Sequence, residues 1–329
     1  MLFLLRTAGI AFPLLVLGAW FIPPWGWGLP LLMGIVWPYG GGLLYLAGLT
    51  TDRKYRGAWI GGLVGWIGSL AFLWQLWPFS HPSPGSLRVG SFNMDAAHYR
   101  RPQIERLIDS LHRWHPDILC LQEVYLGDYS AKAFAQKLGY PYFTFLDAGG
   151  HTGMFVAAKW PIQHSRNLLL LPGTTNGLQE VLIVLPHGEK AKLLHVHFPS
   201  YRLGRKESWR WGWWRSVWSH HRHFAETLWQ HIQGWRGPLW VCGDFNALPY
   251  HPLYLRLWQK LHDAFYASTW GEGPTWKHPW LRIDYIWSSR PAQWYGVRWI
   301  PSQAHGYVEA HFPLEGKPEK PVPLQTAGR

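Results

Sequence analysis

The stretch Leu239-Trp-Val-Cys-Gly-Asp-Phe-Asn246 (LWVCGDFN) is an apolar run that leads through a glycine into a carboxylate and a carboxamide. Four apolar residues in a row predict a buried strand. Asp244 and Asn246 are two residues apart, so an extended backbone would point both side chains the same way. An ordinary Asp/Asn turn would need neither the glycine nor the strand before it. We therefore interpret Asp244 and Asn246 as a functional pair at a strand end.

The same pattern, a polar residue at the end of an apolar run, recurs along the chain. Asn93, Glu123 and His197 each follow such a run. Ligand-binding groups collect at strand ends in layered α/β folds. One acid in such a place is usually a cap or turn residue, but carboxylate, carboxamide and imidazole groups together favour a site for a hard cation and a phosphate.

Strand-like runs alternate with helical patterns over the rest of the chain. Apolar residues at helical spacing predict helices over residues 104–111, 134–138 and 217–232. Strand-like runs occupy residues 87–92, 118–121, 154–158, 168–171, 181–185, 193–196, 239–242, 282–287 and 294–300. This mixture predicts an α/β (or α+β) sandwich.

Composition excludes a disordered or fibrous protein. The 329 residues are 48% hydrophobic and 15% charged, against about 25% charged in an average soluble domain. The net charge of +12 favours a polyanionic partner such as nucleic acid, a phosphorylated small molecule or anionic lipid. The two cysteines, Cys120 and Cys242, lie in apolar runs without zinc-ligand spacing. Their context indicates buried thiols rather than a disulfide or a catalytic thiol.

Residues 1–79 are interpreted as a membrane anchor. Three apolar stretches, Leu2 to Ile22, Pro30 to Leu49 and Ala58 to Trp77, each approach the roughly 20 residues that cross a bilayer as a helix. Tryptophans lie mostly near their ends, as in an interfacial aromatic belt. The alternatives are buried core helices, or a cleaved signal peptide, which would explain only the first stretch. We predict three transmembrane helices.

Basic residues predict the orientation of this anchor. The turn Thr51-Asp-Arg-Lys-Tyr-Arg56 holds three cations, whereas the turn around Pro23 to Gly28 holds none. Positive residues stay cytoplasmic, so everything after Trp77 should lie outside the cytoplasm. A Pro/Ser/Gly linker at 80–86 then leads to one domain at 87–315, and residues 316–329 are predicted to form a disordered tail. The prediction is a multi-pass integral membrane protein with a non-cytoplasmic catalytic domain.

The ordered motifs after the linker resemble the endonuclease/exonuclease/phosphatase superfamily, which includes DNase I-like nucleases, sphingomyelinases and inositol-phosphate phosphatases. The resemblance covers Leu87 to about Leu314. Its pieces are Ser91-Phe-Asn-Met-Asp95, Leu121-Gln-Glu123, Val196-His-Phe198, Gly243-Asp-Phe-Asn246, Arg282-Ile-Asp-Tyr-Ile286 and Ala310-His-Phe-Pro313. The resemblance implies a two-sheet DNase I-like sandwich flanked by helices, and a Mg²⁺-dependent phosphoesterase for which Mn²⁺ is an alternative metal.

The resemblance also implies roles for single residues. Glu123 would be the principal metal ligand, helped by Asn93 and, as in some family members, by Asp95; such hard oxygen ligands suit Mg²⁺. Asp244 would orient or deprotonate the attacking water, and Asn246 would hold that water and the phosphate.

Two histidines would complete this catalytic set. Asp284 lies in an apolar strand, where an unpaired carboxylate is costly to bury. The resemblance supplies His311 as its partner, which would stabilise developing charge or protonate the leaving oxygen. His197 would be a second imidazole beside the phosphate, whereas His195 is interpreted as a strand residue.

The sequence departs from the resembled family at one position. The family normally has Asp directly before the last histidine, where it helps to hold the metal, but here the residue is Ala310, preceded by Glu309. Either Asp95 and Glu309 compensate, or metal binding is weak, or catalysis is lost. Two functions stay open: a membrane-anchored Mg²⁺-dependent phosphoesterase acting on phosphodiesters or phosphomonoesters, and a non-catalytic module that binds phosphorylated ligands.

The segment Tyr201 to Phe224 (YRLGRKESWRWGWWRSVWSHHRHF) interleaves basic and aromatic residues. Such a segment could stack on bases and neutralise phosphates, or lie at a bilayer surface, or form an amphipathic helix with a solvated basic face. The membrane anchor favours the bilayer surface. Arg202, Arg205 and Trp209 are the predicted substrate-binding residues, for a nucleic acid or a lipid headgroup.

Overall fold

The computed structural model describes residues 77–78, 84–95, 101–201, 211–249, 251–270, 273–277, 281–301 and 303–313. The predicted membrane segments and tail lie outside the described residues, except for Trp77. That residue belongs to the short strand β1 (Trp77–Pro78), which pairs with β11 (Thr269–Trp270), so the expectation of a helix through Trp77 was wrong. Within the described ranges, no helix has both the length and the apolar character needed to cross a membrane.

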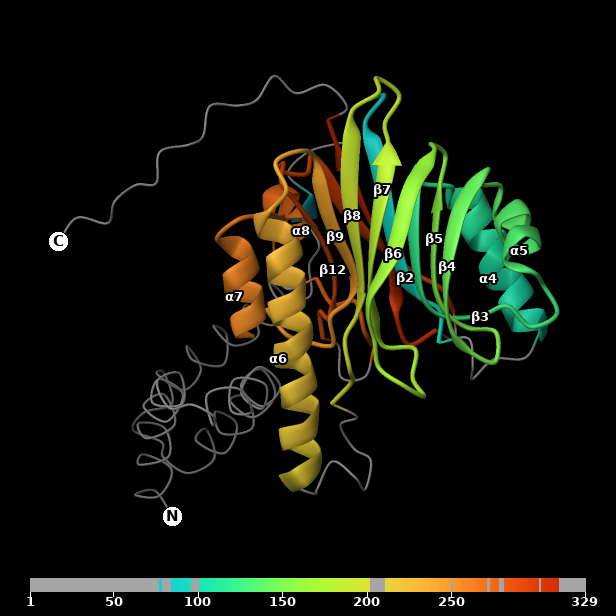
Figure 1. Ribbon diagram of the computed structural model, residues 1–329. Helices are drawn as coiled ribbons and strands as arrows, with labels where there is room; N and C mark the ends of the chain where they lie inside the picture. Colours follow the sequence, from blue (N-terminus) through green and yellow to red (C-terminus); the bar gives the residue numbers. More distant parts are fainter. Residues whose placement is uncertain are drawn as a thin grey trace, which may run out of the picture.

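Two six-stranded sheets form the body of the domain (Figure 1). The first sheet has the order β10-β12-β9-β8-β7-β6 and the second has the order β13-β14-β2-β3-β5-β4. Only the central pairs β8–β9 and β2–β3 are parallel within these two sheets. The first sheet contains β6 (Ile162–Leu170), β7 (Gly177–Val184), β8 (Lys190–His197), β9 (Leu239–Asp244), β10 (His262–Asp263) and β12 (Asp284–Ser288). The second contains β2 (Leu87–Asn93), β3 (Ile118–Tyr125), β4 (Tyr142–Gly149), β5 (Thr152–Ala158), β13 (Trp294–Trp299) and β14 (Gly306–Phe312).

Helices cover the outer faces of the sheets and complete a four-layer α/β sandwich (Figure 1). The helices are α4 (Arg101–Trp114) and α5 (Ala131–Leu138) on the second sheet, α6 (Trp211–Gln233) and α7 (Pro252–Trp258) on the first, and the short α8 (Ala264–Ser268). The predicted helical spacing is confirmed in α4, where Ile104, Leu107 and Leu111 are buried against the second sheet. The Ser130 side chain caps α5 by accepting the backbone N–H of Ala133.

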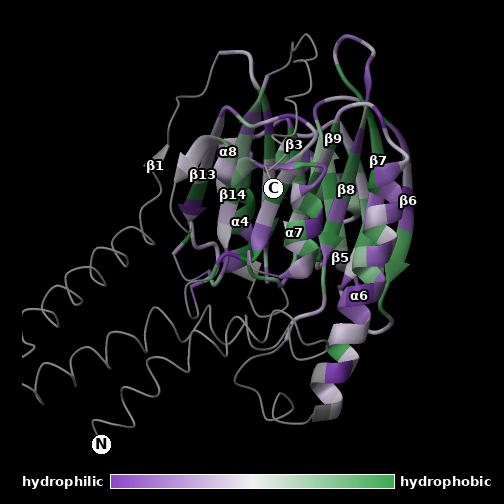
Figure 2. Cartoon of the chain, turned by 90° about the vertical axis from the view of Figure 1, so that its left-hand side faces the viewer, coloured by the Kyte–Doolittle hydropathy of each residue, from purple (hydrophilic) through white to green (hydrophobic). Residues whose placement is uncertain are grey.

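The central strands are buried on both faces, because one face meets the opposite sheet and the other meets helices. Val89, Ile118, Val181 and Ile286 belong to the core between the sheets. This double burial explains why several strands are almost continuously apolar in sequence. Figure 2 shows apolar residues along β8 and β9, whereas α6 alternates between hydrophilic and apolar residues.

Two long elements of the second sheet, β4 and β14, were not predicted from the sequence. The sequence of β14 is Gly-Tyr-Val-Glu-Ala-His-Phe, and all seven residues are buried. Glu309 and His311 interrupt its apolar pattern, so hydropathy does not predict a strand there. They are buried because β14 lies inside the sheet, between β13 and β2. The position of this strand decides which histidine belongs to the site.

Candidate active site

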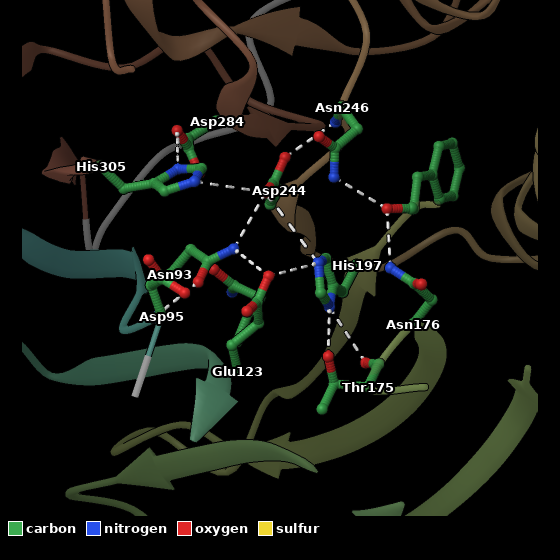
Figure 3. Close-up of polar contacts among 12 residues, drawn as sticks. Asn93, Asp95, Glu123, Thr175, Asn176, His197, Asp244, Asn246, Asp284 and His305 are labelled. Atoms are coloured by element: carbon green, nitrogen blue, oxygen red, sulfur yellow. Dashed lines mark hydrogen bonds and ion pairs between the residues drawn. The ribbon is translucent and has the colours of Figure 1, made fainter. Parts of the chain in front are cut away.

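Seven of the predicted site residues come together where the central strands of both sheets end (Figure 3). The register of β8, β9 and β12 places His197 opposite Asp244, and Asp244 opposite Asp284. In the other sheet, Asn93 and Glu123 lie near the carboxyl-terminal ends of β2 and β3. The Asn93 amide donates to Glu123 Oε1 (3.1 Å) and to Asp244 Oδ2 (3.0 Å). One carboxamide thus joins a carboxylate from each sheet.

Glu123 lies at a bulge in β3. The pairing of β3 with β5 shifts register between Leu121 and Val124, and Glu123 has a φ of 50°. A bulge re-aims a side chain, and here it leaves the Glu123 side chain 27% exposed beside buried neighbours. Burial opposes the charge, but the hydrogen bond and charge of His197 and the amide of Asn93 outweigh it and lower the pKa of Glu123 to about 2. Glu123 is therefore ionised at neutral pH.

The chain turns sharply after Asp244, the last residue of β9. The predicted extended backbone was wrong, because Asn246 has a left-handed φ of 46°. Asp244 Oδ1 accepts the Asn246 backbone N–H (2.8 Å), and the Asn246 side chain donates to the Phe198 carbonyl (2.9 Å). The motif glycine has a steric reason: with a φ of 141°, a Cβ on Gly243 would lie 1.8 Å from the carbonyl oxygen of Val196. Only glycine allows β8 and β9 to approach this closely here.

Asp244 is the central carboxylate of the site and is 1% exposed. Burial and the neighbouring charge of Asp284 raise the pKa of Asp244 to about 6, against the opposing effects of His305 and His197. Its Oδ2 lies 4.0 Å from His197 Nε2 and 3.9 Å from His305 Nε2. A carboxyl group that is held in place and has a pKa near neutrality is suited to general base catalysis.

The predicted pairing of Asp284 with His311 was wrong, because its partner is His305. The His305 Nδ1 lies 3.1 Å from Asp284 Oδ2. Thr275 holds the two elements together: its hydroxyl accepts the Asp284 N–H (3.0 Å) and its carbonyl accepts the Gly306 N–H (2.7 Å). Burial opposes charge on the imidazole, but Asp284 outweighs burial and raises the pKa of His305 to about 9. His305 therefore carries a positive charge at neutral pH.

His311 lies at the opposite end of β14 from the site. Strand β14 is antiparallel to β2, and its register places His311 opposite Arg88, near the beginning of β2. The end of β2, where Asn93 lies, is met by the beginning of β14, immediately after His305. His311 instead contacts Glu309, with 2.8 Å between Nε2 and Oε1. The antiparallel connection therefore separates His311 from the other predicted residues.

Ala310 is consequently not a lost metal ligand. Its side chain belongs to the fully buried core between the sheets. The alternative in which Glu309 compensates for it was also wrong, because Glu309 pairs with Arg88 and accepts a hydrogen bond from Tyr307. The residue that precedes the site histidine is Ala304. The aspartate expected from the resembled family is therefore missing at position 304.

His197 lies on the other side of Asp244 from His305 (Figure 3). Its Nδ1–H donates to the Thr175 carbonyl (3.0 Å), and its Nε2 lies 3.4 Å from Glu123 Oε1. Burial lowers the pKa of His197, but the hydrogen bond and charge of Glu123 outweigh this effect and raise it above the ordinary value. Two imidazoles that favour the protonated form thus flank one carboxylate.

Two sets of described residues could hold a cation. Asp244, Asp284 and His305 have ligand atoms within 4.8 Å of one another. A protonated imidazole cannot bind a metal, and His305 is charged beside two carboxylates, so a cation at this set would first have to displace its proton. The predicted set of Asn93, Asp95 and Glu123 fits a hard cation better, because Glu123 is ionised and partly exposed. Asn93 Oδ1 accepts the Asp95 N–H (2.9 Å), which keeps Asp95 beside this set.

The remaining predicted residues, Arg202, Arg205 and Trp209, lie outside the described residues. Sequence reasoning missed His305 and Thr275. A histidine directly before a strand antiparallel to β2 must lie beside the end of β2, so the topology would have identified His305. Thr275 acts through loop contacts that no sequence pattern signals.

Comparison with known proteins agrees with this architecture. A model of the endonuclease/exonuclease/phosphatase family matches residues 90–307. No curated protein matches the chain. The human Nocturnin catalytic domain with bound sulfate is similar in structure, with 20% identity, a TM-score of 0.53, and coverage of 71% of this chain and 96% of that chain.

Two further solved structures give the same result. Truncated TDP2 from Caenorhabditis elegans has 17% identity and a TM-score of 0.53, covering 70% of this chain and 99% of that one. The 3′ phosphatase NExo from Neisseria, bound to a product DNA hairpin, has 17% identity and a TM-score of 0.53. The match covers 69% of this chain and 99% of that chain. These likenesses establish the DNase I-like fold, and the family match spans most of the domain. The chain belongs to the endonuclease/exonuclease/phosphatase family.

Proposed function

We propose that the chain is a metal-dependent phosphoester hydrolase in which Asp244 activates water for in-line attack on phosphorus. The arrangement around Asp244 carries this proposal. Its pKa is raised to about 6, the Asn93 amide fixes one oxygen, and the imidazoles of His197 and His305 lie about 4 Å from it. A base of this pKa beside the charged His305 and a second imidazole, His197, suits phosphoryl chemistry, in which positioning and charge stabilisation dominate.

We expect Glu123, Asn93 and Asp95 to hold Mg²⁺, with Mn²⁺ as the alternative. When bound, such an ion neutralises charge on the phosphate oxygens and polarises phosphorus. Because Ala304 stands where the resembled family has a carboxylate, the cation depends mainly on Glu123.

The residues of the chain itself would transfer the protons and hold the phosphate. Asp244 accepts the proton of the attacking water, and Asn246, tied to Asp244 through its backbone N–H, helps to hold the phosphate. The His305 imidazolium, oriented by Asp284, donates a hydrogen bond to a phosphoryl oxygen or protonates the leaving oxygen. His197, whose Nδ1–H is held by the Thr175 carbonyl, presents Nε2 from the opposite side.

We further propose that the domain works at the non-cytoplasmic surface of a membrane, on nucleic acid or on a phosphorylated lipid headgroup. The three apolar stretches and the basic turn between the last two support the anchor. The basic and aromatic residues of the segment 201–224 support a surface role, and the first turns of α6, which belong to this segment, pack against the chain that follows β8 and β9. Trp213 Nε1 donates to the Tyr201 carbonyl after β8 (3.4 Å), and Val217 packs with Leu248 after β9. The product DNA in the NExo structure makes DNA one substrate class to test.

The test of enzymatic function is turnover of bis(p-nitrophenyl) phosphate by the purified full chain. We expect turnover with Mg²⁺ and none with excess EDTA, with recovery when Mg²⁺ is restored. No turnover with Mg²⁺ or Mn²⁺, together with retained binding of inorganic phosphate, would instead support the non-catalytic module. Release of nucleotides from plasmid DNA, compared with release of phosphate or headgroup from anionic lipid vesicles, then separates the two substrate classes.

The membrane topology has its own test. A reporter that is active only after export should be active when fused after Ser86 and inactive when fused at Lys54. The reverse pattern would place the domain in the cytoplasm and overturn this part of the proposal.

A further inference from the structure

The two cysteines of the chain meet in the centre of the domain. Cys120 lies on β3 of the second sheet and Cys242 on β9 of the first. Both are 0% exposed and belong to the core between the sheets. Their Sγ atoms lie 2.7 Å apart, although the residues are 122 positions apart in sequence. The sequence predicted two buried thiols rather than a disulfide. Their burial is confirmed, but the facing of the two sheets, which the sequence does not show, brings the two sulfurs into contact.

This contact lies directly beneath the candidate active site. Cys242 precedes Asp244 by two residues on β9, and Cys120 lies on the same strand as Glu123. Beside it, the Gln122 amide contacts His195 Nε2 at 2.7 Å, between β3 and β8. The strands that carry the metal ligand and the base are therefore in side-chain contact one layer below the site.

We propose that Cys120 and Cys242 form a disulfide that links the two sheets. The pairing is unambiguous, since the chain has only two cysteines. The two Sγ atoms, 2.7 Å apart, would need to approach by less than about 1 Å to reach the length of a disulfide bond. A bond closing so long a loop is of the kind that stabilises most in the chain-entropy model.

Forming this bond requires a disulfide as the oxidant, either a low-molecular-weight disulfide or that of a thiol–disulfide oxidoreductase. The thiolate of one cysteine attacks the oxidant's disulfide, which releases one oxidant thiolate and leaves a mixed disulfide. The second cysteine thiolate then attacks the first cysteine's sulfur, and the second oxidant thiolate leaves. Two thiols and one disulfide become one disulfide and two thiols. Two electrons pass to the oxidant, and the two protons pass to its thiolates.

The buried position indicates when this exchange takes place. Burial, followed by the contact with Cys242, raises the pKa of the Cys120 thiol, and a buried thiol of this kind is inert toward exchange in the folded domain. The bond therefore forms while the chain folds, in a compartment that supplies the oxidant. The proposed non-cytoplasmic placement of the domain is such a compartment, but the disulfide does not depend on the proposed hydrolase activity.

The experiment uses the full chain, expressed with its membrane segments and purified without reductant after alkylation with N-ethylmaleimide under denaturing conditions. Proteolysis and mass spectrometry should recover a peptide pair joined through Cys120 and Cys242, which separates on reduction. Alkylation of both cysteines in the unreduced sample would overturn the proposal.

Thermal unfolding supplies a second measurement. The chain is unfolded with guanidinium and dithiothreitol in detergent and refolded either with reductant or with a glutathione redox buffer. We expect the oxidised form to melt about 5 to 15 °C higher, whereas a Cys120→Ala/Cys242→Ala variant should melt at the same temperature under both conditions. Equal melting temperatures for the two wild-type samples, with free thiols in both, would also overturn the proposal.

Discussion

Replacing the two candidate histidines separately tests the central assignment of the site. His305→Gln removes the imidazolium that Asp284 orients, whereas His311→Gln is a matched change at the other end of β14. If His305 stabilises charge on the phosphate or protonates the leaving oxygen, its loss should lower kcat by about 10²- to 10⁴-fold. His311 lies about six residues further along an extended strand, which is roughly 20 Å away. At that distance His311 cannot contact a substrate held at the site, so His311→Gln should change kcat less than about threefold.

The pKa of His305 provides an independent readout of the same contact. A pKa of about 9 in the folded state, against about 6.5 when unfolded, corresponds to roughly 3 kcal/mol of stabilisation. Because the folded pKa is the higher one, this stabilisation is complete below pH 6.5 and is lost as the pH rises through 9. The wild-type free energy of unfolding, measured in EDTA, should therefore fall between pH 6.5 and 9 more steeply than that of His305→Gln.

The assay is bis(p-nitrophenyl) phosphate turnover at saturating Mg²⁺, with urea unfolding of each variant to confirm that it is folded. His311→Gln should lose only about 1 kcal/mol of stability, from the hydrogen bond to Glu309. A His305→Gln variant with wild-type kcat, or a folded His311→Gln variant that loses as much activity as His305→Gln, would refute the reasoning.

Three further outcomes are expected. Glu123→Gln should keep the fold but lose most Mg²⁺-dependent turnover, because it removes the charge that holds a hard cation; a wild-type Mg²⁺ titration curve would contradict this role. Ala310→Asp should destabilise the domain by several kcal/mol by burying an unpaired carboxylate, whereas Ala304→Asp should lower the Mg²⁺ concentration for half-maximal activity; the reverse result in unfolding and Mg²⁺ titrations would restore the original assignment. Burial lowers the pKa of His221 to about 4 and also lowers that of His251 well below its ordinary value, so the unfolded chain binds more protons below pH 6.5. The contribution of these two histidines should therefore be complete above that pH and should fall on acidification below it by up to about 1.4 kcal/mol per pH unit for each histidine; equal urea midpoints at pH 7 and pH 5 would contradict this.

The sequence by itself determined the layered fold and most of the candidate site. Apolar runs that end in Asn93, Glu123, His197 and Asp244 identified strand ends, because a strand buried on both faces is apolar until it reaches the polar edge of the sandwich. The glycine of the GDFN motif was evident in the sequence, but its steric reason, the close approach of the Val196 carbonyl on β8, came only from the structure.

Only the tertiary structure decided which groups meet across the sheets. Asp284 and His305 are brought together by the direction of β14, and an antiparallel strand reverses which of its ends lies at the site. No local pattern encodes that direction. The strand β14 was not predicted at all, because Glu309 and His311 are polar and are buried only through the position of the strand inside the sheet. The contact between Cys120 and Cys242 has the same origin. Each thiol is an apolar strand residue in sequence, and only the packing of two sheets across one core places them side by side.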